Sequence, residues 1–193
     1  MRVKTLSKRD AILEGASRVL ATKQFHEVTS EEIAAEAGVG KGTLYRYFQT
    51  KEEIYFATIV KGFEGLHQVL ATTIEQEISP TERLRRIARE CLRFFWHRRY
   101  FYALLYRNDR LFVEHEGEIR QARERVIGVI QRVVVDGIRQ KEFRGVDSRL
   151  AAEFFSGMIR AANIFRRDDD TAEALVGELM AIFTGGIARA SRP

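Results

Sequence analysis

Apolar residues recur three and four positions apart along nearly the whole chain, which is the spacing of one face of a helix. The stripe of Ile12, Ala16, Val19 and Leu20, for example, marks a helix over about residues 7–23. Only 2 of the 193 residues are proline, so few positions interrupt this period. The pattern predicts an all-α fold of about nine helices, with an N-terminal three-helix domain and a larger C-terminal helical domain.

Residues that favour helix N-termini stand at the start of most predicted helices: Ser7, Thr29, Thr50, Ser79, Asp147 and Thr171. Glu32 and Glu53 follow their threonines by three positions and complete capping boxes. Pro80 occupies the first helical position, which proline favours. Beyond the first three helices we expect six more. Their approximate spans are 51–77, 80–99, 100–112, 116–140, 148–167 and 172 onward.

Residues 28–51 contain two short helical segments joined by a turn. Thr29 begins the first segment, and Gly38 ends it after about two turns. In the second, Leu44 and Phe48 are four positions apart and can face the core. The residues left facing outward offer hydrogen-bond donors and flat rings: Lys41, Thr43, Tyr45, Arg46 and Tyr47. This arrangement is typical of a helix-turn-helix whose second helix enters the major groove of DNA.

The same stretch holds a recognisable set of short motifs: Ile33-Ala34, Ala37-Gly38-Val39, Gly42-Thr43-Leu44-Tyr45, Tyr47-Phe48 and Lys51. In combination they resemble the signature of the TetR family of bacterial transcriptional regulators. The resemblance implies an all-helical homodimer, with an N-terminal DNA-binding domain and a C-terminal domain that binds a small molecule and dimerises. It favours a repressor over an activator and does not identify the ligand.

The residues expected to contact DNA are Thr29, Lys41, Gly42, Thr43, Tyr45, Arg46, Tyr47 and Lys51. Lysine ammonium groups can neutralise phosphates, which sets affinity without reading sequence. Thr43 can touch a thymine methyl group, and Arg46 can bond the edge of a guanine. The family resemblance implies that Tyr45, Tyr47 and Lys51 hold the DNA backbone, while Lys41, Gly42, Thr43 and Arg46 lie near the bases. For the two tyrosines, simple packing is the alternative interpretation.

The chain departs from the family pattern at two positions. Most family members carry serine where this chain has Gly40, but glycine also serves as an N-cap. Glu31 lies on the outward side of the preceding helix, where it can accept from a cytosine amino group or simply stabilise the helix N-terminus. Lys4, Lys8 and Arg9 form either a phosphate-contacting arm or a solvated basic tail.

The formal net charge is +5, and its distribution is more informative than its total. Basic minus acidic residues give 9 − 6 = +3 for residues 1–51, 1 − 5 = −4 for residues 52–80 and 22 − 16 = +6 for residues 81–193. A basic N-terminal block fits a module that faces DNA. We expect a helix-turn-helix domain at 1–51, a connecting helix at 52–80 and an effector-binding and dimerisation domain at 81–193.

The remaining composition is that of a cytoplasmic protein. The chain has one cysteine, no apolar run long enough to span a membrane and no signal-peptide pattern at its N-terminus. The expected partners are a double-stranded DNA operator, a small-molecule effector and a second copy of the chain. No cofactor, metal site or membrane contact is expected.

The segment from Cys91 to Phe112 is dense in aromatic residues and can build an apolar pocket, although ordinary helical core is the alternative for any one of them. The predicted effector-binding residues are Cys91, Phe95, Trp96, Tyr102, Tyr106, Phe154 and Met158. An elongated hydrophobic or aromatic effector is the first expectation. The arginines crowded over residues 83–99 indicate either a solvated face with pairs such as Glu82–Arg86, or an anionic ligand such as an acyl-coenzyme A thioester.

The last two predicted helices carry apolar stripes with small residues among them. The predicted dimer interface consists of Phe165, Leu175, Leu179, Ile182, Phe183 and Gly186. Two such helices from each protomer would form a four-helix interface. A monomeric core is the alternative, but a helix-turn-helix that reads an operator usually needs two-fold pairing.

Two other functions compete with a ligand-responsive regulator. An enzyme has little support, because Cys91 and His97 are six residues apart on different faces of one helix and no other nucleophile–base pair stands out. An architectural DNA-binding protein without an effector would leave the aromatic-rich C-terminal half unexplained. The sequence therefore favours a ligand-responsive transcriptional regulator. The family resemblance implies a repressor that a small hydrophobic or aromatic effector releases from a palindromic operator.

Overall fold

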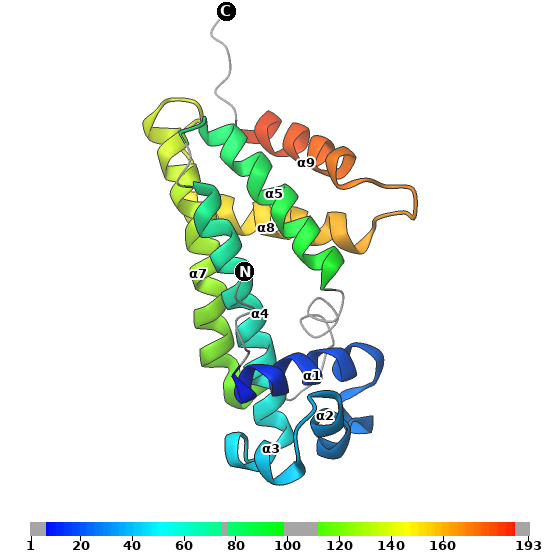
Figure 1. The fold of residues 1–193 in the computed structure, drawn as a ribbon. Coiled ribbons are helices and arrows are strands. Elements are labelled where there is room, and N and C mark those ends of the chain that lie inside the picture. The colour runs from blue at the N-terminus through cyan, green and yellow to red at the C-terminus, as the bar shows by residue number, and fades with distance from the viewer. Residues whose placement is uncertain (1–6, 75–76, 99–111, 188–193) are drawn as a thin grey trace, which may run out of the picture. The chain divides into compact units, whose positions relative to one another are not determined.

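The computed structural model describes residues 7–74, 77–98 and 112–187, and within these ranges it contains helices and no strand (Figure 1). The elements are α1 (Lys8–Thr22), the 3₁₀ turn η1 (Phe25–Glu27), α2 (Ser30–Glu36), α3 (Lys41–Tyr47), α4 (Lys51–Ile74), α5 (Pro80–His97), α7 (Phe112–Arg139), α8 (Ser148–Ile164) and α9 (Ala172–Ile187). The predicted all-α fold is confirmed. The helix predicted over 100–112 lies almost entirely outside the described residues.

The chain divides into two compact units. The first holds Met1–Glu64 with Arg98–Gln121, and the second holds Gly65–His97 with Ala122–Pro193. Both α4 and α7 are continuous helices that begin in the first unit and end in the second. We call the part of the first unit formed by α1, α2 and α3 the head. The predicted domain limits at residues 51 and 80 stay predictions.

The predicted cap residues begin their helices as expected. The Ser7 hydroxyl accepts from the backbone N–H of Asp10 at 3.1 Å, and the Asp147 carboxylate accepts from Leu150 N–H at 2.9 Å. Thr29 and Glu32 form the complete capping box at the start of α2. Gly38 has a φ of +65°, a left-handed conformation that glycine adopts without strain, so it ends α2 as its position predicts.

Some helix limits differ from prediction. The helix predicted over 116–140 begins earlier, at Phe112. The helix predicted to reach Arg167 ends at Ile164. There the Asp170 carboxylate accepts from the backbone N–H of Arg167 at 2.7 Å, which favours a turn over a further helical turn.

The head has a small, tightly packed core. Ile12, Ile33 and Leu44, one from each helix, are fully buried. A Cβ atom on Gly15 would lie 2.8–2.9 Å from the backbone and Cβ of Ala37, so α1 and α2 approach as closely as glycine allows. The packing of α1 on α2 therefore leaves no room for a larger residue at position 15.

The second unit is built around the apolar face of α5, which packs against both α8 and α9. Leu84, Ile87 and Leu92 on this face are fully buried. The rings of Phe155 on α8 and Phe183 on α9 meet edge to face, with centroids 4.8 Å apart. The inner faces of α8 and α9 are therefore part of the core of a single chain.

Candidate functional site

The short helix α3 is held by its apolar side and exposes the rest. Leu44 and Phe48 are buried, as predicted. The predicted outward side chains of Lys41, Tyr45, Arg46 and Tyr47, with Gly42, are exposed, and Thr43 is half-buried. The two tyrosines keep 39% and 38% of their surface accessible, so each presents part of its ring to a partner. A groove-sized helix thus presents donors and aromatic rings to solution.

Charged groups on this surface are paired with each other. The Lys41 ammonium forms an ion pair with Glu31 of α2, and this ammonium lowers the pKa of the Glu31 carboxyl below its usual value. The Arg46 guanidinium lies 5.6 Å from the ring centroid of Tyr47. Both pairs are exposed, so they are weak enough to exchange for DNA phosphates or bases.

Two of the predicted DNA contacts have partners inside the head. The Thr29 hydroxyl accepts from Glu32 N–H and donates to the Glu32 carboxylate, both at 3.2 Å. The Lys51 ammonium donates to the carbonyls of Phe25 and Val28 at 2.8 Å each. Their roles in DNA binding stay predictions. The capping role of Thr29 was predicted from the sequence, whereas the hydrogen bonds of Lys51 to the two carbonyls were not.

The basic N-terminal residues lie partly in the described chain. Lys8 and Arg9 occupy the first turn of α1, while Lys4 lies outside the described residues. The Arg9 guanidinium is 5.2 Å from the ring centroid of Phe48, just beyond the end of α3. This contact places one additional cation beside the recognition helix, a proximity that sequence spacing alone could not indicate.

The five predicted effector residues that the structure describes do not gather in one place. Cys91 and Phe95 lie on the buried face of α5, where burial raises the pKa of the Cys91 thiol to about 12. Trp96, next on the helix, is half-buried, and Arg166 lies 4.8 Å from its ring centroid. Tyr102 and Tyr106 lie outside the described residues. A protonated, buried thiol is a packing group and not a nucleophile.

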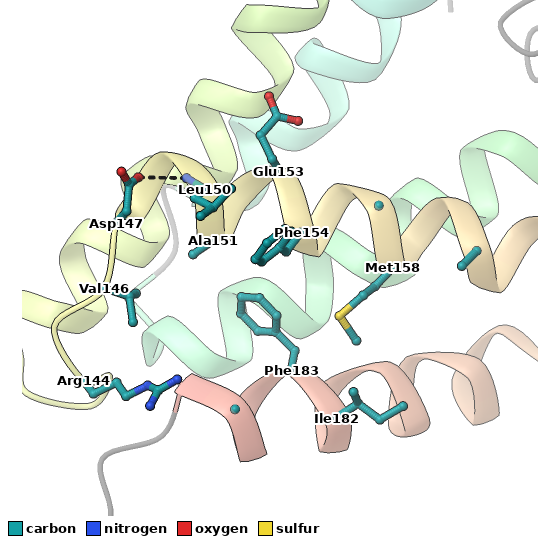
Figure 2. Close-up of a pocket in the computed structure, with 13 residues that line it drawn as sticks. Arg144, Val146, Asp147, Leu150, Ala151, Glu153, Phe154, Met158, Ile182 and Phe183 are labelled. Atoms are coloured by element: carbon teal, nitrogen blue, oxygen red, sulfur yellow. Dashed lines mark hydrogen bonds between the residues drawn. The ribbon is translucent and has the colours of Figure 1, made fainter.

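Phe154 and Met158 instead line an open apolar groove of about 660 Å³ between α8 and α9, which we call the α8–α9 groove. Figure 2 shows both side chains on α8, facing Ile182 and Phe183 on α9. Cys91, Phe95 and Trp96 are not part of its lining. The structure therefore separates the predicted effector set and joins two of its members to the predicted dimer residues.

The predicted dimer residues divide between two faces. Phe165 and Ile182 are 81% and 67% exposed, and Gly186 is exposed as well. Leu179 and Phe183 are only 4% and 5% exposed, because they pack inside the chain. Leu175 is half-buried. Both sides of α9 carry apolar residues. The apolar spacing in the sequence therefore did not show which of these residues face the core and which face solvent.

A second, smaller pocket of about 350 Å³ lies on the polar face of α5. Its lining includes Arg86, Arg89 and Arg93 together with Glu82 and Glu90. The Arg89 guanidinium donates to both carboxylate oxygens of Glu173 on α9, at 2.7 and 3.0 Å. The predicted Glu82–Arg86 pair is present at 3.5 Å. Carboxylates thus accompany the arginines, as in a solvated charged face.

Two features are absent from the described ranges. No helix there is long and apolar enough to cross a membrane. Within the same residues, no group of three or more histidine, cysteine, aspartate or glutamate side chains could hold a metal ion.

Sequence comparison decides the family. The model of bacterial regulatory proteins of the TetR family matches residues 12–58, and that of a tetracycline repressor-like C-terminal domain matches residues 77–164. The chain belongs to the TetR family of bacterial transcriptional regulators. The first match contains the whole of α2 and α3, so this TetR-family protein carries its family's signature on the surface described above.

Two relatives of this TetR-family chain are named as regulators, and the name of one refers to fatty acid metabolism. The transcriptional activator FasR of Mycolicibacterium smegmatis is 32% identical over 106 residues, 53% of this chain and 47% of its own length. The fatty acid metabolism regulator protein of Bacillus subtilis is 24% identical over 160 residues, 77% of each chain. The chain thus spans about half the length of the first relative and about three quarters of the second.

Solved structures share the fold over nearly the full length. The transcriptional regulator FadR of Bacillus subtilis, in complex with stearoyl-CoA, has a TM-score of 0.81 at 20% identity and covers 92% of this chain and 98% of its own. AibR, in complex with isovaleryl coenzyme A and operator DNA, has a TM-score of 0.75 at 22% identity and covers 91% and 97%. At these identities the likeness establishes the fold of this TetR-family member.

Proposed function

We propose that this TetR-family protein is a homodimeric repressor that binds a palindromic operator and releases it when an acyl-coenzyme A thioester binds. The observation that carries the proposal is the outward surface of α3, with Lys41, Tyr45, Arg46 and Tyr47 exposed around a buried Leu44–Phe48 stripe. Such a helix fits the major groove. Acting on chromosomal DNA places the protein in the cytoplasm.

Dimerisation through the α8–α9 groove is supported by the apolar side chains that the single chain leaves exposed. In the groove, Phe154 and Ile182 are 63% and 67% exposed and Leu150 is half exposed. At the end of α8, outside the groove lining, Phe165 is 81% exposed. Exposed apolar patches of this kind mark interaction surfaces. A two-fold axis across α8 and α9 would cover the groove with its own copy, and would supply the second recognition helix that a palindrome requires.

An acyl thioester as effector is supported by two relatives and by the chemistry of α5. FadR of Bacillus subtilis is described in complex with stearoyl-CoA, and AibR in complex with isovaleryl coenzyme A. In this chain α5 combines a buried apolar face, which can accommodate an acyl chain, with an opposite face rich in arginine, which attracts an anion. This class of effector replaces the broader expectation of a hydrophobic or aromatic molecule.

Two further observations support a repressor that has no catalytic activity. The C-terminal match is to a tetracycline repressor-like domain. The buried Cys91 thiol, whose pKa is raised to about 12, is unsuited to nucleophilic chemistry at neutral pH. We therefore propose a binding protein without enzymatic activity.

The test begins with an operator selected from random duplexes. Arg46→Ala should cost about 1–3 kcal/mol at particular base pairs and relax selectivity there, because a bidentate arginine reads a base edge. Arg18→Ala, which removes an exposed arginine from α1, is the matched control and should leave selectivity unchanged. Unaltered base preference in Arg46→Ala would contradict this placement of the reading surface.

The effector is tested with stearoyl-CoA and isovaleryl-CoA, with free coenzyme A as the control. Either thioester should quench or shift the fluorescence of Trp96, the only tryptophan, and lower operator affinity about 5- to 150-fold. Thermodynamic linkage requires operator DNA to weaken thioester binding by the same factor. If neither thioester changes operator affinity, the proposed effector class is wrong.

A further inference from the structure

The indole nitrogen of Trp96 is a buried hydrogen-bond donor that the folded chain leaves unused. Trp96 lies in the last turn of α5, and its side chain as a whole is half-buried. Its Nε1 is enclosed by protein, yet no acceptor lies within hydrogen-bond distance of it among the residues that the structure describes. An indole nitrogen can only donate, and a buried donor without an acceptor costs the free energy of its lost contact with water. Such groups are rare in folded proteins, which makes this one a candidate for recognising a ligand.

A cation that has no carboxylate partner lies against the same ring. The guanidinium of Arg166, in the loop between α8 and α9, is 4.8 Å from the centroid of the Trp96 ring. Arg166 is half-buried, and within the described part of the chain no ion pair or hydrogen bond joins its guanidinium to another residue. Arg89 and Arg93 of α5 differ from it, because both pair with Glu173. The positive charge of Arg166 favours an electron-rich oxygen as the acceptor for the indole N–H.

Trp96 lies where the apolar face of α5 meets its arginine-rich face. Leu92, four positions earlier, is fully buried, whereas Arg93, three positions earlier, is exposed. Residues three and four apart are neighbours on a helix surface, so the indole borders both faces.

The same division exists in a fatty acyl thioester of coenzyme A. Its chain is apolar, its nucleotide is anionic, and the thioester carbonyl is the first polar group after the chain. When the chain lies on the apolar face of α5 and the nucleotide on the arginine-rich face, the carbonyl comes to the border between them. That border is the place where the unused donor of Trp96 lies.

We propose that the Trp96 indole N–H donates to the acyl oxygen of the effector, and that Arg166 supplies the adjoining positive charge. The inference rests on the proposed function, because it names the group of this chain that recognises the acyl thioester proposed there as effector. The carboxylate of a free fatty acid offers the same acyl oxygen, so it also satisfies the donor. An alkyl thioether does not, because a methylene group replaces its carbonyl and thioether sulfur is a weak acceptor.

The experiment compares stearoyl-CoA with S-octadecyl-coenzyme A, a thioether of the same chain length without the carbonyl oxygen, by calorimetric titration of the full-length protein. The wild type should bind the thioester about 3- to 10-fold more tightly, because the thioether leaves the buried donor unpaired. Trp96→Phe keeps an aromatic ring beside Arg166 but removes the donor, so it should bind both ligands with equal affinity. If Trp96 served only as packing, the substitution would weaken both ligands equally and keep the wild-type ratio.

The loop after α8 provides a matched pair of variants for the charge. Arg166→Gln should bring the ratio of the two affinities closer to one, because it removes the cation beside the indole. Arg167→Gln removes the next arginine of the loop, which is exposed, and should leave the ratio unchanged. An equal effect of the two substitutions would contradict the role given to Arg166.

NMR of the wild type gives a second measurement that needs no variant, should Trp96→Phe fail to fold. Trp96 is the only tryptophan, so its indole N–H resonance is identified without ambiguity. Stearoyl-CoA should move this proton resonance downfield, as formation of a hydrogen bond does, and S-octadecyl-coenzyme A should not.

Equal affinity of the wild type for thioester and thioether would overturn the proposal, as would a Trp96→Phe variant that keeps the wild-type ratio. If neither coenzyme A ligand binds, the proposed effector class fails and stearate decides. A downfield shift of the indole resonance with stearate then supports the donor site, and an unmoved resonance overturns it. A thioester that binds with the expected ratio but leaves operator affinity unchanged would contradict the proposed switch and not this site.

Discussion

The outward surface of α3 and the α8–α9 groove are both formed by large side chains that the folded chain leaves accessible, but their chemistry differs. Around α3 each exposed ring has a polar tip and a cation beside it, as in the Arg46–Tyr47 pair. The groove exposes Phe154 and Ile182, which have no polar atom to offer. The first surface suits a charged, hydrated partner, and the second suits an apolar one. Exposure alone therefore does not identify a function, whereas the kind of side chain exposed does.

The largest expected effect separates the two faces of α9. Phe183→Ala should lower the free energy of unfolding by about 3–5 kcal/mol, because Phe183 is buried against Phe155 within one chain. Ile182→Ala should leave the stability of the monomer nearly unchanged but weaken self-association, because Ile182 is 67% exposed. Urea unfolding at low protein concentration, together with sedimentation, measures both. Equal losses of monomer stability would show that the groove is not a separate surface.

The next effect distinguishes the core of the head from its surface. Gly15→Ala should destabilise the protein by about 1–3 kcal/mol, because the added Cβ would meet the backbone of Ala37 at 2.8 Å. Gly42→Ala meets nothing within 4 Å and should change stability by no more than about 0.5 kcal/mol. Its effect should appear in DNA affinity, where the methyl group obstructs close approach. Thermal unfolding and operator titration of both variants provide the test, and a stable Gly15→Ala would contradict the close helix crossing.

The smallest expected effect is the stability that the Asp10–Lys61 ion pair loses at low pH. Lys61, with a further hydrogen bond from Ser7, lowers the pKa of Asp10 below its ordinary 3.8. A carboxyl whose pKa is lower in the folded state stabilises the protein above 3.8, and this contribution is lost as the pH falls through the lowered value. For a partly exposed pair we expect about 0.2–1 kcal/mol. Asp10→Asn should lose less stability than the wild type on acidification, which urea titrations above and below pH 3.8 would measure. An identical pH dependence would mean that the pair contributes nothing.

Local chemistry made most of the helix limits predictable. Ser7, Thr29 and Asp147 each cap the helix that follows because their side chains accept from a backbone N–H three positions on. Gly38 ends α2 because it adopts a positive φ. These interactions join residues close in sequence, so the order of residues contains the information needed.

The candidate sites were less predictable where two faces of one helix are both apolar. The apolar spacing on α9 did not distinguish Leu179 and Phe183, which are 4% and 5% exposed, from Ile182, which is 67% exposed. Nor did it show that Phe154 and Met158 of α8 face α9 and not the buried side of α5. A hydrophobic period indicates that a face is buried, but it does not name what buries it.

The sequence by itself determined the all-α class, the helix-turn-helix and the outward set on α3, because periodicity, caps and one family signature are local properties. Only the tertiary structure decided which apolar residues are left for a partner and which cations are already bound. Lys51 shows the reason, since its two carbonyl acceptors lie 26 and 23 residues earlier in the chain. Contacts between residues so far apart depend on how α1, α2 and α4 pack together, and no local pattern records that packing.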